Sequence, residues 1–135
     1  MVFLGRDSFI FYIVKNYGKP LRQYSTLLAI MKEYYPWLLD DILLNRCSFC
    51  KKQFKSRKGL VIHYKERRQC HNKIIDIAKH VLDIYEKVKQ YTKYEGKGVY
   101  KIFIGNPHIR VESIQEAIRI LRKQGVLPEV INHEN

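Results

Sequence analysis

The sequence has few acidic residues and no long apolar run. Its 135 residues include 13 Asp and Glu against 25 Lys and Arg, which gives a formal net charge of +12. This excess favours polyanionic partners, nucleic acid ahead of an anionic membrane surface. A membrane-spanning helix needs roughly 18–20 apolar residues, and the longest candidate here, 37–44, is interrupted by Asp40 and Asp41. We therefore expect no membrane partner.

Targeting features and cysteines are also scarce. No basic residue precedes the apolar stretch at the N-terminus and no small-residue cleavage site follows it, so no secretory signal is predicted. The three cysteines fall within one short segment, and an odd number argues for a metal site rather than a disulfide framework. We expect an intracellular, cytoplasmic protein. The Lys-, Ile- and Tyr-rich composition resembles that of small proteins of thermophilic archaea or their viruses, in which case the compartment would be the host cell.

Catalytic signatures are missing as well. The sequence contains no paired carboxylates, no Gly-rich phosphate loop and no Ser/His/Asp spacing. Asp40 and Asp41 are adjacent rather than convergent, and we interpret them as a helix surface. The protein is therefore predicted not to be an enzyme.

The periodicity predicts an α+β, mostly helical fold in three segments of one integrated domain. Segment 1–45 is helical, with helices expected from Asp7 or Ser8 to Tyr17, from near Pro20, and over 37–44. Segment 46–71 is an inserted finger. Segment 72–135 holds a long helix, a short β-hairpin over 92–104, and a C-terminal helix opened by a capping box at Ser113 and Glu116.

The long helix carries an apolar stripe at alternating spacings of three and four residues. Its members are Ile74, Ile77, Val81, Ile84, Val88 and Tyr91. Such a stripe suits either packing against the protein's own core, which the short length favours, or a homodimer through Ile74–Tyr91.

A metal-binding motif occupies 47–63. Cys47 and Cys50 are separated by two residues, and His63 follows after twelve more. A C-x2-C turn can bring two thiolates to one ion, and a following helix can add an imidazole. Phe54 and Leu60 supply a mini-core too small to fold without metal. We therefore expect bound Zn²⁺.

These five positions resemble the Cys2His2 zinc-finger family, which implies a ββα finger over 46–71. The family places its last ligand three to five residues after the first histidine, but 64–69 contains neither Cys nor His. The candidates are Cys70, which we prefer, and His71. On an unbroken helix Cys70 would lie roughly 10 Å along the axis from His63, so the helix must end or distort around 66–69. His80, His108 and His133 are expected to have no metal role, and His80 to be solvated.

Positive charge is concentrated on the finger. Between residues 46 and 73 there are ten basic residues and one acidic residue. The predicted phosphate contacts are Lys51, Lys52, Lys55, Arg57, Lys58, Lys65, Arg67 and Arg68. The base-reading positions implied by the family are Ser56, Gly59 and Ile62, which are poor readers.

These features predict a zinc-finger nucleic-acid-binding protein, a DNA-binding transcription regulator that contacts phosphates of double-stranded DNA. The alternative is a protein–protein interaction module with a purely structural zinc. The C-terminal helix also resembles the recognition helix of winged helix-turn-helix regulators, which implies that Arg119, Arg122 and Lys123 face phosphates; an ordinary amphipathic helix is the other interpretation.

Overall fold

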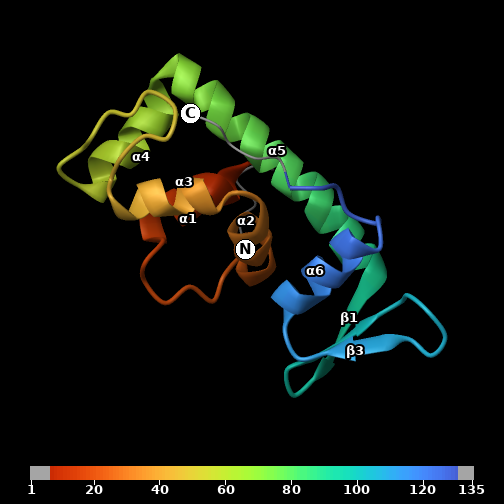
Figure 1. Ribbon diagram of the computed structural model, residues 1–135. Helices are drawn as coiled ribbons and strands as arrows, with labels where there is room; N and C mark the ends of the chain where they lie inside the picture. Colours follow the sequence, from red (N-terminus) through yellow and green to blue (C-terminus); the bar gives the residue numbers. More distant parts are fainter. Residues whose placement is uncertain (1–6, 131–135) are drawn as a thin grey trace. The chain divides into compact units, whose positions relative to one another are not determined.

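The computed structural model describes residues 7–130, and within them the chain forms six helices and three strands (Figure 1). The elements are α1 (Ser8–Asn16), α2 (Ser25–Tyr34), α3 (Pro36–Leu43), α4 (Arg57–Glu66), α5 (Arg68–Tyr91), β1 (Thr92–Gly96), β2 (Val99–Ile102), β3 (Ile109–Val111) and α6 (Ile114–Lys123). The expected α+β, mostly helical fold is confirmed. Of the histidines discussed above, His133 lies outside the described residues.

The chain divides into two compact units whose boundaries differ from the expected segments. Unit 1 comprises 1–25 and 35–80, and unit 2 comprises 26–34 and 81–135. The finger segment lies inside unit 1, together with α1 and α3. The long helix α5 belongs to unit 1 up to His80 and to unit 2 from Val81 onward.

The predicted second helix begins later than expected. The sequence favoured a start near Pro20, but α2 starts at Ser25. Tyr24 has a φ of 62°, in the left-handed region, which is incompatible with a continuous right-handed helix. Proline at the first helical position suits α3 instead, where Pro36 opens the helix.

Segment 46–56 has less β-structure than the ββα finger that the sequence resemblance implied. Its two expected strands are reduced to an isolated antiparallel bridge between Arg46 and Gln53. Its helix, α4, begins after Ser56, whose hydroxyl accepts a hydrogen bond from the Gly59 amide at 3.2 Å. In unit 1, α4 packs against α1.

The α5 stripe is buried within the single chain. Five of its residues are at most 8% exposed, namely Ile74, Ile77, Val81, Ile84 and Val88. This burial is what packing against the protein's own core requires. The homodimer stays a prediction.

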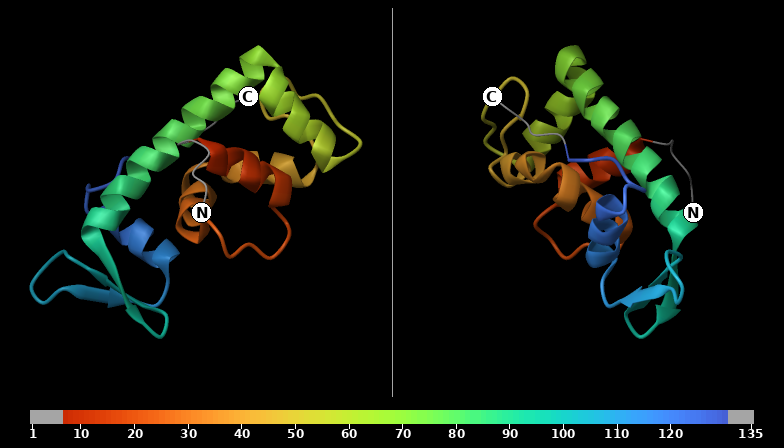
Figure 2. Two further views of the ribbon diagram at one scale, coloured as in Figure 1. Left: turned by 180° about the vertical axis from the view of Figure 1, so that it is seen from behind. Right: turned by 45° about the vertical axis from the view of Figure 1, so that its right-hand side comes forward.

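Unit 2 contains the predicted hairpin and one strand that was missed. β1 pairs with β2, and β3 adds to the other side of β2, all antiparallel. In the views of Figure 2, α6 lies beside this sheet, and it contacts β2 and β3. Ser113 caps α6 by accepting a hydrogen bond from the Glu116 amide at 3.0 Å. Ile102 and Val111 are buried on the face of the sheet that α6 covers.

Candidate metal centre

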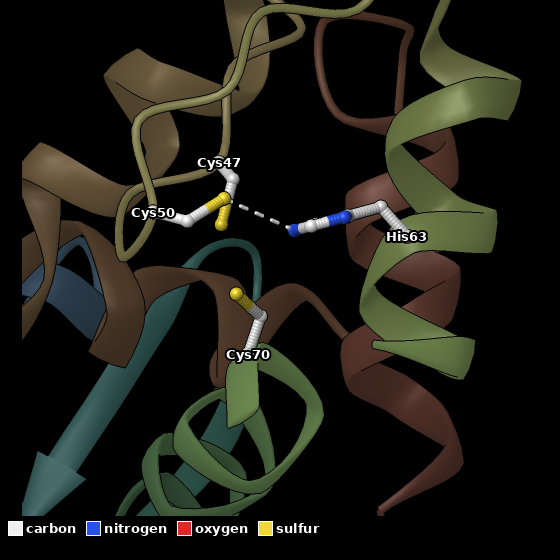
Figure 3. A group of neighbouring side chains, drawn as sticks. All are labelled: Cys47, Cys50, His63 and Cys70. Atoms are coloured by element: carbon white, nitrogen blue, oxygen red, sulfur yellow. Dashed lines mark hydrogen bonds between the residues drawn. The ribbon is translucent and has the colours of Figure 1, made fainter. Parts of the chain in front are cut away.

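Cys47 and Cys50 lie on the tight turn between α3 and α4 (Figure 3). The Cys47 amide donates to the Lys52 carbonyl at 2.9 Å, and the Lys51 amide donates to the Cys47 carbonyl at 3.0 Å. Lys51 adopts a left-handed φ of 67°, which turns the chain back on itself directly after Cys50. The turn therefore brings both sulfurs to the same side of the loop.

The third candidate ligand, His63, projects from α4 toward this turn. The expected mini-core forms beside it: Leu60 is fully buried, and the rings of Phe54 and His63 have centroids 4.9 Å apart. Packing against Phe54 restricts the imidazole, so little rotamer freedom remains to be lost on metal binding.

Cys70 reaches the group because α4 ends where the spacing required it to end. Arg67, with a ψ of 104°, is extended and terminates α4, and α5 starts at the next residue. The predicted break around 66–69 is thus confirmed. Cys70 falls in the first turn of α5, and this change of direction allows its side chain to point toward the sulfurs of Cys47 and Cys50 (Figure 3).

The four side chains form a group that could hold a metal ion. The ligand atoms of Cys47, Cys50, His63 and Cys70 all lie within 4.8 Å of one another, and the Cys50 sulfur is 3.4 Å from Nε2 of His63. A tetrahedral zinc ion with sulfur at about 2.3 Å sets its ligand atoms roughly 3.5–3.8 Å apart. The group therefore fits such an ion after side-chain movements of about 1 Å.

The surroundings shift the pKa values of Cys50, His63 and Cys70 in different directions. Burial raises the pKa of the Cys70 thiol to about 12, and the neighbouring sulfurs of Cys47 and Cys50 add to this effect. Burial acts the same way on Cys50, but hydrogen bonds from the Lys52 amide and from the other thiols outweigh it and lower the pKa of Cys50. Burial lowers the pKa of His63, which favours the neutral imidazole that metals bind.

A polar network that the sequence did not reveal supports the turn. Asp41, only 7% exposed, accepts hydrogen bonds from the Ser48 hydroxyl at 2.7 Å and from Arg46 at 2.6 and 3.0 Å. The Ser48 amide donates to the Tyr64 hydroxyl at 3.1 Å. The interpretation of Asp41 as helix surface was therefore wrong: it joins α3 to the residue that follows Cys47, in the manner of the outer-shell groups that orient metal ligands.

The other histidines have different surroundings. His71 donates through Nδ1 to the Tyr64 carbonyl at 3.0 Å and stacks on Phe11, so the structure places Cys70, and not His71, with the other three ligands. His80 was expected to be solvated, but it is half-buried and its Nδ1 lies 2.6 Å from the Tyr35 hydroxyl. Tyr35 is 45 residues away in the sequence, so no residue near His80 could indicate this contact.

Unit 1 contains a groove beside α4 in which five of the seven lining residues are cationic. Its volume is about 550 Å³, and it lies between the end of α1 and the exposed face of α4. The lining residues are Lys15, Lys19, Arg57, Lys58, Val61, Ile62 and Lys65. Three of the eight predicted phosphate contacts line it: Arg57, Lys58 and Lys65. Lys15 and Lys19 lie outside the finger segment, and sequence reasoning did not include them.

Arg57 differs from the other predicted contacts. Its guanidinium donates to the Tyr17 carbonyl at 2.6 Å, to the Val14 carbonyl at 3.3 Å and to Asn45 Oδ1 at 3.0 Å. All three acceptors are neutral, so the positive charge of Arg57 has no carboxylate against it among these partners. The remaining five predicted contacts are exposed on the finger outside the groove, namely Lys51, Lys52, Lys55, Arg67 and Arg68.

The arginines of α6 bind a carboxylate of the same unit. Glu33 of α2, whose side chain is 8% exposed, accepts from Arg119 at 2.6 Å and from Arg122 at 3.1 Å. These ion pairs join residues 86 and 89 positions apart. The expectation that Arg119 and Arg122 face phosphates is therefore corrected: α6 uses them to attach to α2.

Comparison of the chain with protein-family models, with curated proteins and with solved structures finds no significant match. Among residues 7–130, no helix combines the length and the apolar character needed to cross a membrane.

Proposed function

We propose that Cys47, Cys50, His63 and Cys70 bind one Zn²⁺ ion with a structural role. Three thiolates and one imidazole are the donors that zinc prefers, and tetrahedral sites of this composition have no position left for a substrate. The four ligands come from a loop and two helices, so an ion there would cross-link the α3–α4 turn to both α4 and α5.

We further propose that the zinc-bound unit binds nucleic acid, with duplex DNA as the preferred form. The observation that carries this proposal is the groove beside α4, which has five cations and no carboxylate in its lining. Lysine and arginine side chains arranged in this way bind phosphates, and neutralising several phosphates releases counterions from the duplex.

The finger positions associated with base reading favour phosphate contact over sequence recognition. The Ser56 hydroxyl is engaged in capping α4. Gly59 faces Phe54, and a Cβ atom placed there would lie 3.4 Å from that ring. Ile62, 43% exposed, can offer only an apolar contact. A role in transcription regulation would therefore need sequence recognition from another surface or from DNA shape.

The alternative function is a module that binds an acidic protein. It would use the same groove, because Val61 and Ile62 add apolar surface to its cations. Interfaces that bind proteins combine an apolar centre with a charged rim. The phosphate proposal is favoured because five of the seven lining residues are cationic.

Binding of the zinc-loaded chain to a mixed-sequence duplex, followed by fluorescence anisotropy at several salt concentrations, tests the proposal. The triple variant Lys15→Gln, Lys58→Gln, Lys65→Gln should bind more weakly, and the slope of log affinity against log salt should fall by roughly 0.9 for each lost contact. The control variant Lys79→Gln, Lys87→Gln, Lys89→Gln removes equal charge from α5. Equal losses in the two variants would refute the groove as the binding surface, and an unaltered affinity in the first would favour the interaction module.

A further inference from the structure

The three-stranded sheet of unit 2 carries a row of cations across its strands. Lys93 of β1 is paired with Lys101 of β2, and Lys101 is paired with Arg110 of β3. Residues in register on adjacent strands project from the same face, so the three cationic side chains stand side by side. The neighbouring pairs, Tyr100 with Val111 and Ile102 with Ile109, project to the opposite face, which α6 covers.

Like charges directly opposite each other weaken a sheet, whereas β-branched or aromatic pairs at the same positions would strengthen it. Only Arg110 has an ionic partner on this face, Glu95 at 2.9 Å, and within residues 7–130 neither lysine forms an ion pair. The sheet is therefore less stable than it would be with β-branched or aromatic pairs at these positions. A bound polyanion would remove this repulsion.

An exposed aromatic ring adjoins the row. Phe103 is 39% exposed, and the Lys101 ammonium lies 5.6 Å from its ring centroid, which places the ring on the same face as the cations. His108 packs its ring edge-on against Phe103 at 5.4 Å and fixes its orientation. The other prominent exposed aromatic, Tyr94, is engaged in the β1–β2 turn, where its hydroxyl accepts a hydrogen bond from the Gly98 amide at 3.0 Å.

We propose that this outer face of the sheet is a second nucleic-acid-binding surface, specific for single strands. Lys93, Lys101 and Arg110 would contact successive phosphates, and Phe103 would stack on one unpaired base. Stacking on Phe103 favours single-stranded over double-stranded nucleic acid, because the bases of a duplex already stack on each other and leave no face for a side chain. The surface belongs to unit 2 and the groove to unit 1, so this proposal extends the proposed function and does not depend on it.

The test uses the full chain and a short labelled oligothymidylate, with a duplex of the same length as comparison. Lys93→Gln with Lys101→Gln should weaken binding to the oligothymidylate and lower its salt slope by roughly 0.7 for each lost contact. The same variant should melt at a higher temperature than the parent, because the like-charge repulsion is gone. Lower affinity together with higher stability separates a binding role from a structural one.

Phe103→Leu should weaken binding to the oligothymidylate by about 5-fold or more, the lower end of what base–aromatic stacking contributes. Its affinity for the duplex should not change. The charge-matched control is Lys87→Gln with Lys89→Gln, on α5 of the same unit.

Four results would overturn the proposal. They are a parent chain that does not bind the oligothymidylate, an unchanged affinity in the lysine variant, an equal loss in the control, and a Phe103→Leu variant that binds as tightly as the parent. The groove variant described above, Lys15→Gln, Lys58→Gln, Lys65→Gln, should retain oligothymidylate binding by the sheet. If the groove variant loses duplex binding but keeps oligothymidylate binding, the loss bears on the groove only, and the sheet proposal is supported.

Discussion

Replacing Arg57 with lysine should destabilise unit 1 while the groove keeps its charge. The guanidinium donates to two backbone carbonyls at the end of α1, those of Val14 and Tyr17, and to the side chain of Asn45. The last carbonyls of a helix have no partner within the helix, so they depend on such donors. Both carbonyl bonds come from one nitrogen, Nη1, whereas the bond to Asn45 comes from Nε, so the single nitrogen of a lysine ammonium can serve one of these two positions but not both.

The expected loss follows from the three distances. A hydrogen bond from a charged donor contributes about 1.5–3 kcal/mol. The bond at 3.3 Å is near the limit of useful geometry, and those at 2.6 and 3.0 Å are good. If lysine keeps the carbonyl bonds and loses the bond to Asn45, Arg57→Lys should lower the free energy of unfolding by about 1.5–3 kcal/mol. With a urea m-value of about 1–3 kcal/mol/M, the midpoint should fall by roughly 0.5–3 M.

Urea unfolding measured by circular dichroism, with duplex binding measured on the folded variant, checks this reasoning. The matched control is Lys58→Gln, an exposed neighbour that also lines the groove. It should change the free energy of unfolding by less than about 0.5 kcal/mol and weaken duplex binding. If the Arg57→Lys variant unfolds at the same urea midpoint as the parent, Arg57 does not anchor the end of α1. Its predicted role as a phosphate contact would then be favoured again.

Two further predictions concern the metal centre and the attachment of α6. Cys70→Ser should lose stoichiometric zinc, measured by metal analysis after dialysis, whereas His71→Gln should retain it; the reverse pattern would make His71 the fourth ligand. Burial opposes ionisation of Glu33, but hydrogen bonds from Gln115, Arg119 and Arg122 outweigh it and lower the pKa of this carboxyl below its usual 4.5. The stabilisation from ionised Glu33 is therefore complete above pH 4.5 and is lost as the pH falls through the lowered pKa of the folded state. Glu33→Gln should accordingly destabilise the protein at neutral pH and become equal to the parent in acid; a difference in melting temperature that does not change with pH would contradict this account.

Features encoded by neighbouring residues could be predicted from the sequence. The spacing of Cys47, Cys50 and His63 predicted three members of the metal group. The distance from His63 to Cys70 predicted the break that separates α4 from α5. Ser56 and Ser113 cap the helices that follow them. The caps and the break depend on contacts within one or two helical turns, and the metal motif depends on spacing within one short segment, so local pattern determines these outcomes.

Features that depend on distant partners could not be predicted. The carboxylate of Glu33 binds arginines more than 80 residues away, so nothing near Arg119 indicated that its charge was already neutralised. Asp41 is a different case, because its partners Arg46 and Ser48 are only five and seven residues away, on the turn beyond α3, where helical periodicity gives no signal. Strand β3 is three residues long and is ordered by its pairing with β2, so its periodicity is too short to recognise.

The candidate metal group extends beyond the segment that resembles a finger. In the Cys2His2 pattern all four ligands lie on one hairpin and one helix, so the finger can fold on its own. Here Cys70 begins the next helix, the Asp41 network joins the C-x2-C turn to α3, and Arg57 joins the start of α4 to the end of α1. Metal binding would thus fix α4 against the rest of unit 1. The packing of α4 against α1 brings Lys15 and Lys19 beside the cations of α4, so the groove is a property of the whole unit and not of segment 46–71 alone.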